Sequence, residues 1–224
     1  LVCRKIGLKK GMKVLDIGAD IGYYTRLFSE LVGPRGNVWA FEPNPESYAF
    51  LEKNTRGRRW SNVRSIQKAV SDTKGSARFF VMNLPAKHGL YNGSRMNPEV
   101  NISQEITVET ISVDDLLSQE GNPEIDFVKM DIEGAEPRAL EGMKRTIARS
   151  TNLTLLVEYN FRMLRLAGTD PLQFVNQIRD MGFRVKGIVP GERLREIDDT
   201  VHRLAQEGYI NLWCTKAESS KQLV

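Results

Sequence analysis

The sequence predicts an α/β fold in which a mostly parallel sheet carries helices on both faces. Short apolar runs that suit buried strands alternate with runs whose apolar residues recur at helical spacing. This alternation is typical of strands joined by crossover helices. The 224 residues are enough for one large domain, and we expect it to cover residues 1–216, with a flexible tail at 217–224.

In the first half of the chain, apolar runs closed by turn residues define the elements. The helix expected over 21–32 places Ile21, Tyr24 and Phe28 on one face, because they are spaced three to four residues apart. Gly and Pro residues in GPRGN at 33–37 end this helix. The strands expected in this half cover 12–17, 37–41, 63–70 and 77–82, and a second helix covers 45–54.

In the second half, residues 83–104 carry little periodicity and many Gly, Asn, Pro and Ser residues. A loop of that length in a compact domain is often a lid or a substrate loop, and we expect that role here. Residues 191–207 are charged and are expected to connect two strands, with His202 in a charged helix. The strands expected in this half cover 104–111, 125–130, 153–157, 183–188 and 209–215, and the helices cover 113–118, 135–148 and 171–181.

Composition and charge exclude several classes of protein. No apolar run is long enough to span a bilayer, and basic residues interrupt the early apolar residues where a signal peptide would lie. The net charge of +4, from 32 basic and 28 acidic residues, does not require a polyanionic partner. Cys3 and Cys214 form no metal-binding spacing, and so few cysteines predict a reducing, cytoplasmic location.

The stretch VLDIGADIGYYT at 14–25 predicts a ligand-binding turn between the first strand and its helix. A dinucleotide site would need G-x-G-x-x-G, so that the backbone can approach a pyrophosphate. Here Gly18 and Gly22 are four residues apart and the middle glycine is absent. Asp16 and Asp20 would also repel a doubly charged anion at close range.

Carboxylates at this turn are better suited to a cationic ligand. S-adenosylmethionine carries a sulfonium and an ammonium group, with one carboxylate that a helix N-terminus can hold. Glu42 ends the second strand, 20 residues beyond Gly22, where a carboxylate can accept hydrogen bonds from a ribose diol. The alternative is that Asp16 and Glu42 only cap loops, in a nucleotide-binding domain of another kind.

Three stretches carry a resemblance to a known family. Residues 14–45, which begin VLDIGADIGYYT and end FEPNP, and DFVKMDIEGAEPRALEGM at 126–143 are similar to the two hallmark motifs of the FkbM family of class I methyltransferases. AVSDTKGSARFF at 69–80 is similar to its middle segment, and the resemblance extends over about 13–158. It implies a Rossmann-like, seven-stranded fold and S-adenosylmethionine-dependent O-methylation, often of sugar or polyketide hydroxyls. One departure is Asp20, where the family usually has an uncharged amide.

The resemblance also implies roles for individual residues. Glu42 would hold the ribose, with Pro43 and Asn44 beside it. Asp72 would accept a hydrogen bond from the adenine amine, or it is only a turn residue in SDTKG. Asp16, Gly18 and Gly22 would line the methionine end of the cofactor. The other expected cofactor-binding residues are Ala19, Asp20 and Asp131.

Asp131 and Glu133 are the candidate catalytic residues. Asp131 ends a central strand beside the glycine turn, and either carboxylate could remove the proton of a hydroxyl acceptor. Glu136 is expected only to complement the helix dipole. Asp131 with Glu158 and Asn160 also resembles the divalent-metal site of catechol-type O-methyltransferases, so a metal ion is an open alternative that we do not favour.

The methyl acceptor is expected to be a hydroxyl of a small molecule or a glycan. Methylation of an RNA ribose, a non-catalytic nucleotide-binding domain and an NAD-dependent domain remain as alternatives. The basic run TRGRRW at 55–60 is more typical of a solvated helix end than of a nucleic-acid site. His88 in the long loop is expected to be solvated, with a role as catalytic base as the alternative. The oligomeric state is not specified by the sequence.

Overall fold

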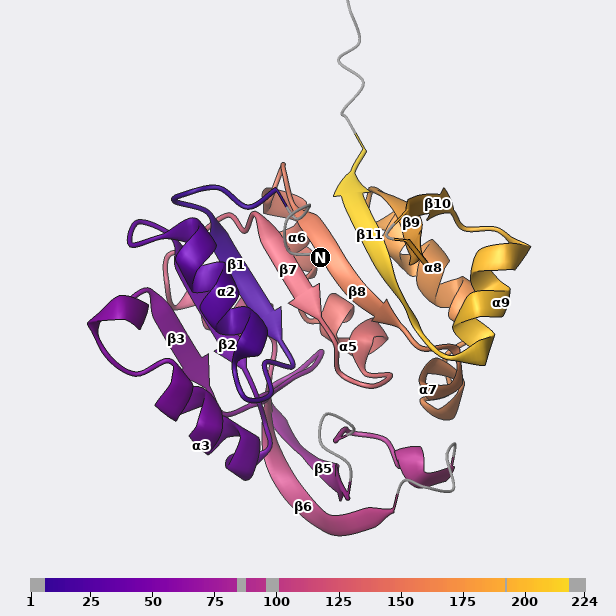
Figure 1. The fold of residues 1–224 in the computed structure, drawn as a ribbon, viewed down its shortest axis with the longest axis horizontal. Helices are drawn as coiled ribbons and strands as arrows, with labels where there is room; N and C mark the ends of the chain where they lie inside the picture. Colours follow the sequence, from indigo (N-terminus) through magenta and orange to yellow (C-terminus); the bar gives the residue numbers. More distant parts are fainter. Residues whose placement is uncertain (1–6, 84–87, 96–100, 192, 218–224) are drawn as a thin grey trace, which may run out of the picture.

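The computed structural model describes residues 7–83, 88–95, 101–191 and 193–217, and an eight-stranded sheet forms its centre (Figure 1). The strands are β1 Lys13–Ile17, β2 Asn37–Phe41, β3 Val63–Ile66, β7 Phe127–Met130, β8 Thr154–Tyr159, β9 Phe183–Val189, β10 Arg193–Glu196 and β11 Ile210–Lys216. Their order is β10-β9-β11-β8-β7-β1-β2-β3. β1 pairs in parallel with β2 and β7, whereas β10 and β11 run antiparallel to their neighbours.

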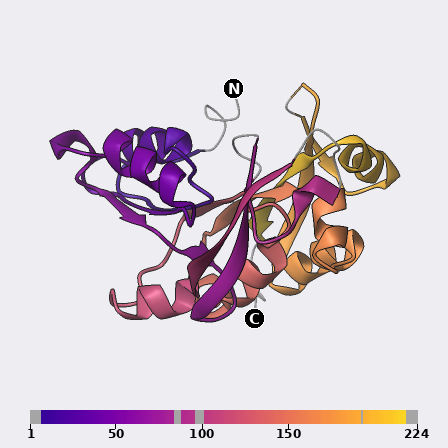
Figure 2. The ribbon, with the colours of Figure 1, turned by 90° about the horizontal axis from the view of Figure 1, so that it is seen from below.

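Helices cover both faces of this sheet (Figures 1 and 2). Val14 of β1 belongs to the same buried apolar cluster as Phe28 of the first helix, whereas its neighbour Leu15 belongs to a second cluster, together with Leu140 and Phe174. Apolar residues at successive positions are therefore buried on both sides, as in parallel sheets generally. The predicted α/β class is confirmed. The helices are α2 Tyr23–Val32, α3 Pro45–Asn54, α4 Val113–Ser118, α5 Glu136–Glu141, α6 Lys144–Arg149, α7 Phe161–Leu166, α8 Pro171–Asp180 and α9 Asp199–Glu207.

Two strand boundaries differ from the prediction. β10 adds an edge strand within 191–207, and its four residues are all exposed, so no apolar alternation reveals it in the sequence. The single strand expected over 63–70 is divided between two sheets. The Lys68 N–H donates to the Ile66 carbonyl at 3.0 Å, and the chain then enters a second sheet as β4 Ala69–Val70.

The helix expected over 135–148 is divided into α5 and α6 at Gly142. The Gly142 carbonyl accepts the Asp114 N–H at 2.9 Å, and a Cβ at Gly142 would lie 1.9 Å from the Ser71 oxygen. The Asp114 carboxylate then accepts the N–H groups of Arg145 at 2.8 Å and Thr146 at 2.7 Å at the start of α6. A tertiary contact therefore ends one helix and caps the next.

The second sheet contains β4, β5 Gly75–Met82 and β6 Ile102–Ile111, in the order β4-β6-β5. The β5–β6 hairpin extends past the end of the main sheet toward which β1 and β7 point (Figure 1). Of the loop expected at 83–104, β6 already begins at Ile102, and Gly89 exchanges backbone hydrogen bonds of 2.8 and 3.1 Å with Phe80.

Some predictions fall outside the described residues. These are Cys3, residues 84–87 and 96–100 of the long loop, and residues 218–224 of the expected tail. Within the described part of the chain, no helix has the length and the apolar character that a bilayer crossing requires.

Candidate active site

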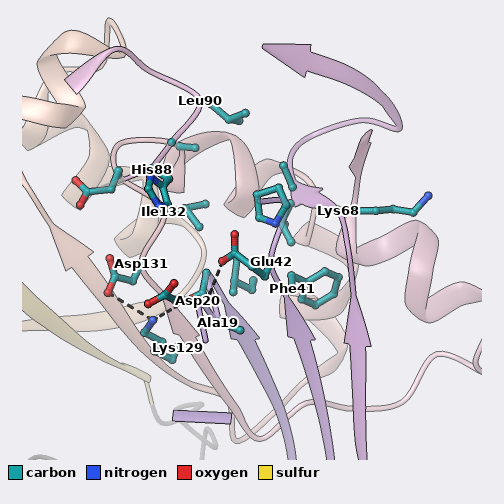
Figure 3. A pocket seen from close by; sticks show the side chains of 18 of the residues that line it. Ala19, Asp20, Phe41, Glu42, Lys68, His88, Leu90, Lys129, Asp131 and Ile132 are labelled. Carbon is teal, nitrogen blue, oxygen red and sulfur yellow. Dashed lines mark hydrogen bonds and ion pairs between the residues drawn. The ribbon is translucent and has the colours of Figure 1, made fainter. Parts of the chain in front are cut away.

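A cavity of about 220 Å³ lies at the carboxyl ends of β1, β2 and β7, and β4 and β5 of the second sheet contribute Val70 and Phe79 to its wall (Figure 3). Seven of the predicted site residues line it: Gly18, Ala19, Asp20, Glu42, Pro43, Asp131 and Glu133. The structure thus brings together residues from three strand ends. Asp16, Gly22, Asn44 and Asp72 are not among the residues that line the cavity.

The glycine turn is held against the ends of both neighbouring strands. The N–H groups of Gly18 and Ala19 both donate to the Phe41 carbonyl of β2, at 3.0 and 2.9 Å. Gly18 has a φ of 81°, and a Cβ there would lie 2.0 Å from the Asp131 carbonyl oxygen of the β7 end. This position requires glycine both for its conformation and for the close approach of β7.

Asp20 closes the turn, and its backbone N–H is already hydrogen-bonded within the protein. It adopts a left-handed φ of 48°, and its N–H donates to Glu42 Oε2 at 2.9 Å. Its own carboxylate accepts the Ser47 hydroxyl at 2.9 Å. Because the Asp20 N–H is already bound by a carboxylate, this turn lacks one of the backbone donors that hold a pyrophosphate in dinucleotide sites.

Glu42 is fixed by backbone donors at the carboxyl end of β2. Its Oε1 accepts the Asn44 N–H at 2.8 Å, while Oε2 accepts the Asp20 N–H. Figure 3 shows the carboxyl group of Glu42 facing the cavity. Burial raises the pKa of this carboxyl to about 7, although both N–H donors act in the opposite direction.

Three of the predicted ligand residues lie behind the cavity wall and support it. Gly22 is the N-cap of α2 at a φ of 89°. The Asn44 side chain caps α3 by accepting the N–H groups of Glu46 and Ser47. Asp16 is fully buried and accepts the Thr25 hydroxyl at 2.6 Å. These three residues therefore hold the helices and strands around the cavity in place and do not line it.

Lys129 of β7 is a lining residue that the sequence analysis missed. Its ammonium donates to the Gly18 carbonyl at 2.9 Å and lies 3.4 Å from Asp131 Oδ2 and 3.9 Å from Asp16 Oδ1. Burial alone would lower the pKa of Lys129, but the two carboxylates raise it above its usual value. The site therefore contains a buried cation between its acids. The signal was present in the sequence as a lysine inside an otherwise apolar strand.

Asp131, Glu133 and Glu158 form an acidic group at the ends of β7 and β8. One carboxylate oxygen from each lies within 4.8 Å of the others. Asn160, which we expected in this set, uses its side-chain oxygen to accept the Met163 N–H that begins α7, and its nitrogen approaches Glu133 at 3.4 Å. The candidate metal-binding group therefore contains Glu133 in place of Asn160.

Glu136 is fully buried and shapes the loop that carries Glu133. Its two oxygens accept the N–H groups of Ile132 and Gly134, each at 2.9 Å. Burial raises its pKa to about 8. Glu133 has a left-handed φ of 52° in this loop. Glu136 thus positions the acidic group and does not itself line the cavity.

Asp72 is turned to another partner. Arg138 donates to its carboxylate at 2.7 Å, and this hydrogen bond lowers its pKa. The residues on either side of Asp72 in the sequence that do line the cavity are Val70 and Phe79 of the second sheet. The adenine contact expected of Asp72 does not follow from this position.

His88 lines the cavity and is half-buried rather than solvated as expected. Its Nδ1 accepts the Met82 N–H at 2.9 Å, so the neutral ring carries its proton on Nε2. Burial lowers its pKa. In this arrangement the ring is a hydrogen-bond donor, and the nitrogen that would act as a base is already occupied.

The fold and the position of the cavity define the class of protein. A SAM-dependent methyltransferase from Aquifex aeolicus is similar with a TM-score of 0.51 and 17% sequence identity, over 96% of this chain and 88% of that chain. The fold is that of class I S-adenosylmethionine-dependent methyltransferases, with β10 added at the edge of the expected seven strands. The profile of the methyltransferase FkbM domain matches residues 16–185, and the chain belongs to the FkbM methyltransferase family.

Curated relatives of the family support this assignment. The 2-O-methyltransferase NoeI of Sinorhizobium fredii is 31% identical over 147 residues, which cover 61% of this chain and 59% of that protein. The hexuronic acid methyltransferase AglP of Haloferax volcanii is 31% identical over 156 residues, which cover 70% of this chain and 56% of that protein. The chain therefore spans less than two thirds of the length of these relatives.

The buried cation gives a first prediction. Lys129→Met leaves Asp16 and Asp131 without their positive neighbour and should lower the free energy of unfolding by about 3–5 kcal/mol near neutral pH. The loss should be smaller at an acidic pH than at neutral pH, because burial raises the pKa of Asp16 and its protonated form needs no cation. Urea unfolding followed by circular dichroism at both pH values measures this.

The matched control is Lys68→Met. Lys68 also lines the cavity, but its partner is the exposed Glu109, so the loss should stay below about 1 kcal/mol. Equal losses in the two variants would show that the Lys129 contacts do not stabilise the fold.

Proposed function

We propose that this chain transfers the methyl group of S-adenosylmethionine to a hydroxyl oxygen of a small molecule or a glycan. The observation that carries the proposal is the Glu42 carboxylate, which faces the cavity beside the glycine turn and is oriented by two backbone N–H groups. A carboxylate held in this way is suited to accept both hydroxyls of a ribose.

The residues present fit this cofactor. Glu42 would bind the ribose, Gly18 and Ala19 would pass beside the methionine portion, and Val70 and Phe79 would offer apolar surface to the base. When bound, S-adenosylmethionine supplies the electrophilic methyl group. The acids of the cavity outnumber Lys129 and Lys68, which favours a ligand with positive charge.

Asp131 is our candidate for the general base. Its side chain is 43% exposed and lies beside Lys129, which fixes its orientation, whereas Glu133 is buried. Since methyl transfer is an in-line displacement, most of the catalysis comes from positioning the acceptor oxygen. Asp131 would hold that oxygen and accept its proton. Glu133 is the second candidate for the same role.

A divalent metal ion is the alternative way to activate the acceptor. Asp131, Glu133 and Glu158 supply the hard oxygen ligands that Mg²⁺ and Ca²⁺ prefer. A metal at this position would lower the pKa of the acceptor hydroxyl. If the base is Asp131 alone, turnover should be unchanged in excess chelator, while Asp131→Asn should reduce kcat by about 10²–10⁴-fold. Loss of turnover with chelator, restored by Mg²⁺, would favour the metal.

The loop residues, location and partners complete the proposal. Gly89 and Leu90 line the cavity, which supports a substrate role for the loop at 83–104. Within the basic run at 55–60, Arg59 pairs with Glu30 and lies 5.0 Å from the ring centre of the buried Trp60. In the chain as a whole, 28 acidic residues nearly balance the 32 basic ones. Nucleic acid is therefore not favoured as a partner.

Cytoplasmic location remains part of the proposal. Cys214 is a buried free thiol, which fits a reducing compartment.

Calorimetry separates the methyltransferase from the dinucleotide alternative. Titration with S-adenosylmethionine should show binding, and titration with NAD should show none, because the Asp20 N–H is bound by Glu42. Binding of NAD in the absence of binding to S-adenosylmethionine would overturn the proposed function.

Glu42 gives a sharper prediction about the cofactor. Because its pKa is about 7, it is ionised and able to accept ribose hydroxyls above that pH and is protonated below it. The affinity for S-adenosylhomocysteine should therefore fall as the pH is lowered through 7, and the fall should level off once the carboxyl is protonated, at about the same 1–3 kcal/mol that its charge-assisted hydrogen bonds supply. Glu42→Gln should bind about 1–3 kcal/mol more weakly at high pH and lose this dependence.

Glu52→Gln is the control, because Glu52 is exposed on α3 and accepts only a Tyr48 hydroxyl among the contacts that the structure describes. It should keep the wild-type affinity and pH profile. A Glu42→Gln protein with unchanged affinity would mean that Glu42 does not contact the ribose.

A further inference from the structure

An exposed aromatic ring stands at the mouth of the cavity. Tyr23, the first residue of α2, lines the cavity although 71% of its surface is exposed. Ile21 also lines it and is 45% exposed. Large apolar side chains that remain exposed at the rim of a cavity can mark a place where a ligand makes contact.

Two side chains connect this ring with the candidate reacting centre. Tyr23 meets Tyr24 edge to face, with ring centres 5.3 Å apart and an angle of 88°. The Lys129 ammonium lies 5.3 Å from the centre of the Tyr24 ring, and the same ammonium lies 3.4 Å from Asp131. Tyr23 is thus linked through two side chains to the candidate base.

The chemistry beside the ring selects among acceptors. The face of an aromatic ring is negative, so it attracts the weakly positive C–H groups on one face of a sugar ring. The carboxylates of Asp131 and Glu133 line the same cavity as Tyr23 and can accept hydrogen bonds from the hydroxyls of an acceptor bound there. A wholly apolar acceptor would cover these carboxylates without supplying donors, which is costly.

We propose that Tyr23 is the platform on which a sugar ring of the methyl acceptor stacks, and that it selects this class of acceptor. The inference rests on the proposed function, because it uses the same cavity and the same acceptor. Tyr23 contacts the substrate and takes no part in the proton transfer. The aromatic ring matters here, and the phenolic hydroxyl does not.

Saturation-transfer NMR on protein saturated with S-adenosylhomocysteine tests this. The probes are methyl β-D-glucopyranoside, methyl α-D-mannopyranoside and methyl α-L-fucopyranoside, with cyclohexanol as the apolar comparison. We expect at least one sugar to bind, with the strongest transfer to the C–H protons of one ring face. Tyr23→Ala should weaken its binding by about three- to tenfold, the size of one lost aromatic contact, and Tyr23→Phe should leave it unchanged.

Phe50→Ala is the matched control, since Phe50 is an aromatic residue that is 48% exposed on α3 and does not line the cavity. It should bind sugar as the wild type does. The inference is overturned if no sugar binds, if cyclohexanol binds more tightly than every sugar, or if Tyr23→Ala binds as the wild type does. Failure of S-adenosylhomocysteine itself to bind would instead overturn the proposed function.

Discussion

The contacts of the buried Lys129 ammonium hold the candidate active site together. One cation reaches the Gly18 carbonyl after β1, the Asp131 carboxylate after β7 and the Asp16 carboxylate inside β1. Two carboxylates this close would repel each other without it, because the surrounding protein screens charge poorly. The shape of the cavity floor therefore depends on a charge balance that is set within the sheet.

A second constraint comes from the use of backbone donors around Glu42. In dinucleotide sites such donors are left for phosphate oxygens. Here the N–H groups of Asp20 and Asn44 are bound by Glu42, and those of Gly18 and Ala19 by the Phe41 carbonyl. The same hydrogen bonds that make the turn unsuited to phosphate also orient the Glu42 carboxylate, which we propose binds the ribose of the cofactor. The hydrogen bonds that fold this turn therefore also decide which ligand groups it can bind.

Much of the fold and half of the site follow from local sequence. Apolar runs of strand length and helical spacing place nearly every central strand and helix, because those strands are buried on both faces. The glycine turn and the acids at strand ends also follow, since parallel strands bring their carboxyl ends to one edge. Gly18, Glu42 and Asp131 meet at the cavity as this logic requires.

Tertiary structure alone decided the rest, because those features depend on partners distant in the chain. The split of the helix at Gly142 follows from contacts with Ser71 and Asp114, and β10 is defined by backbone pairing rather than by side-chain pattern. Whether an acid faces the cavity or supports its wall depends on its neighbours: Asp72 is drawn to Arg138. The sequence by itself therefore determined which acidic and glycine residues stand at the strand ends. Long-range packing determined which of these side chains line the cavity.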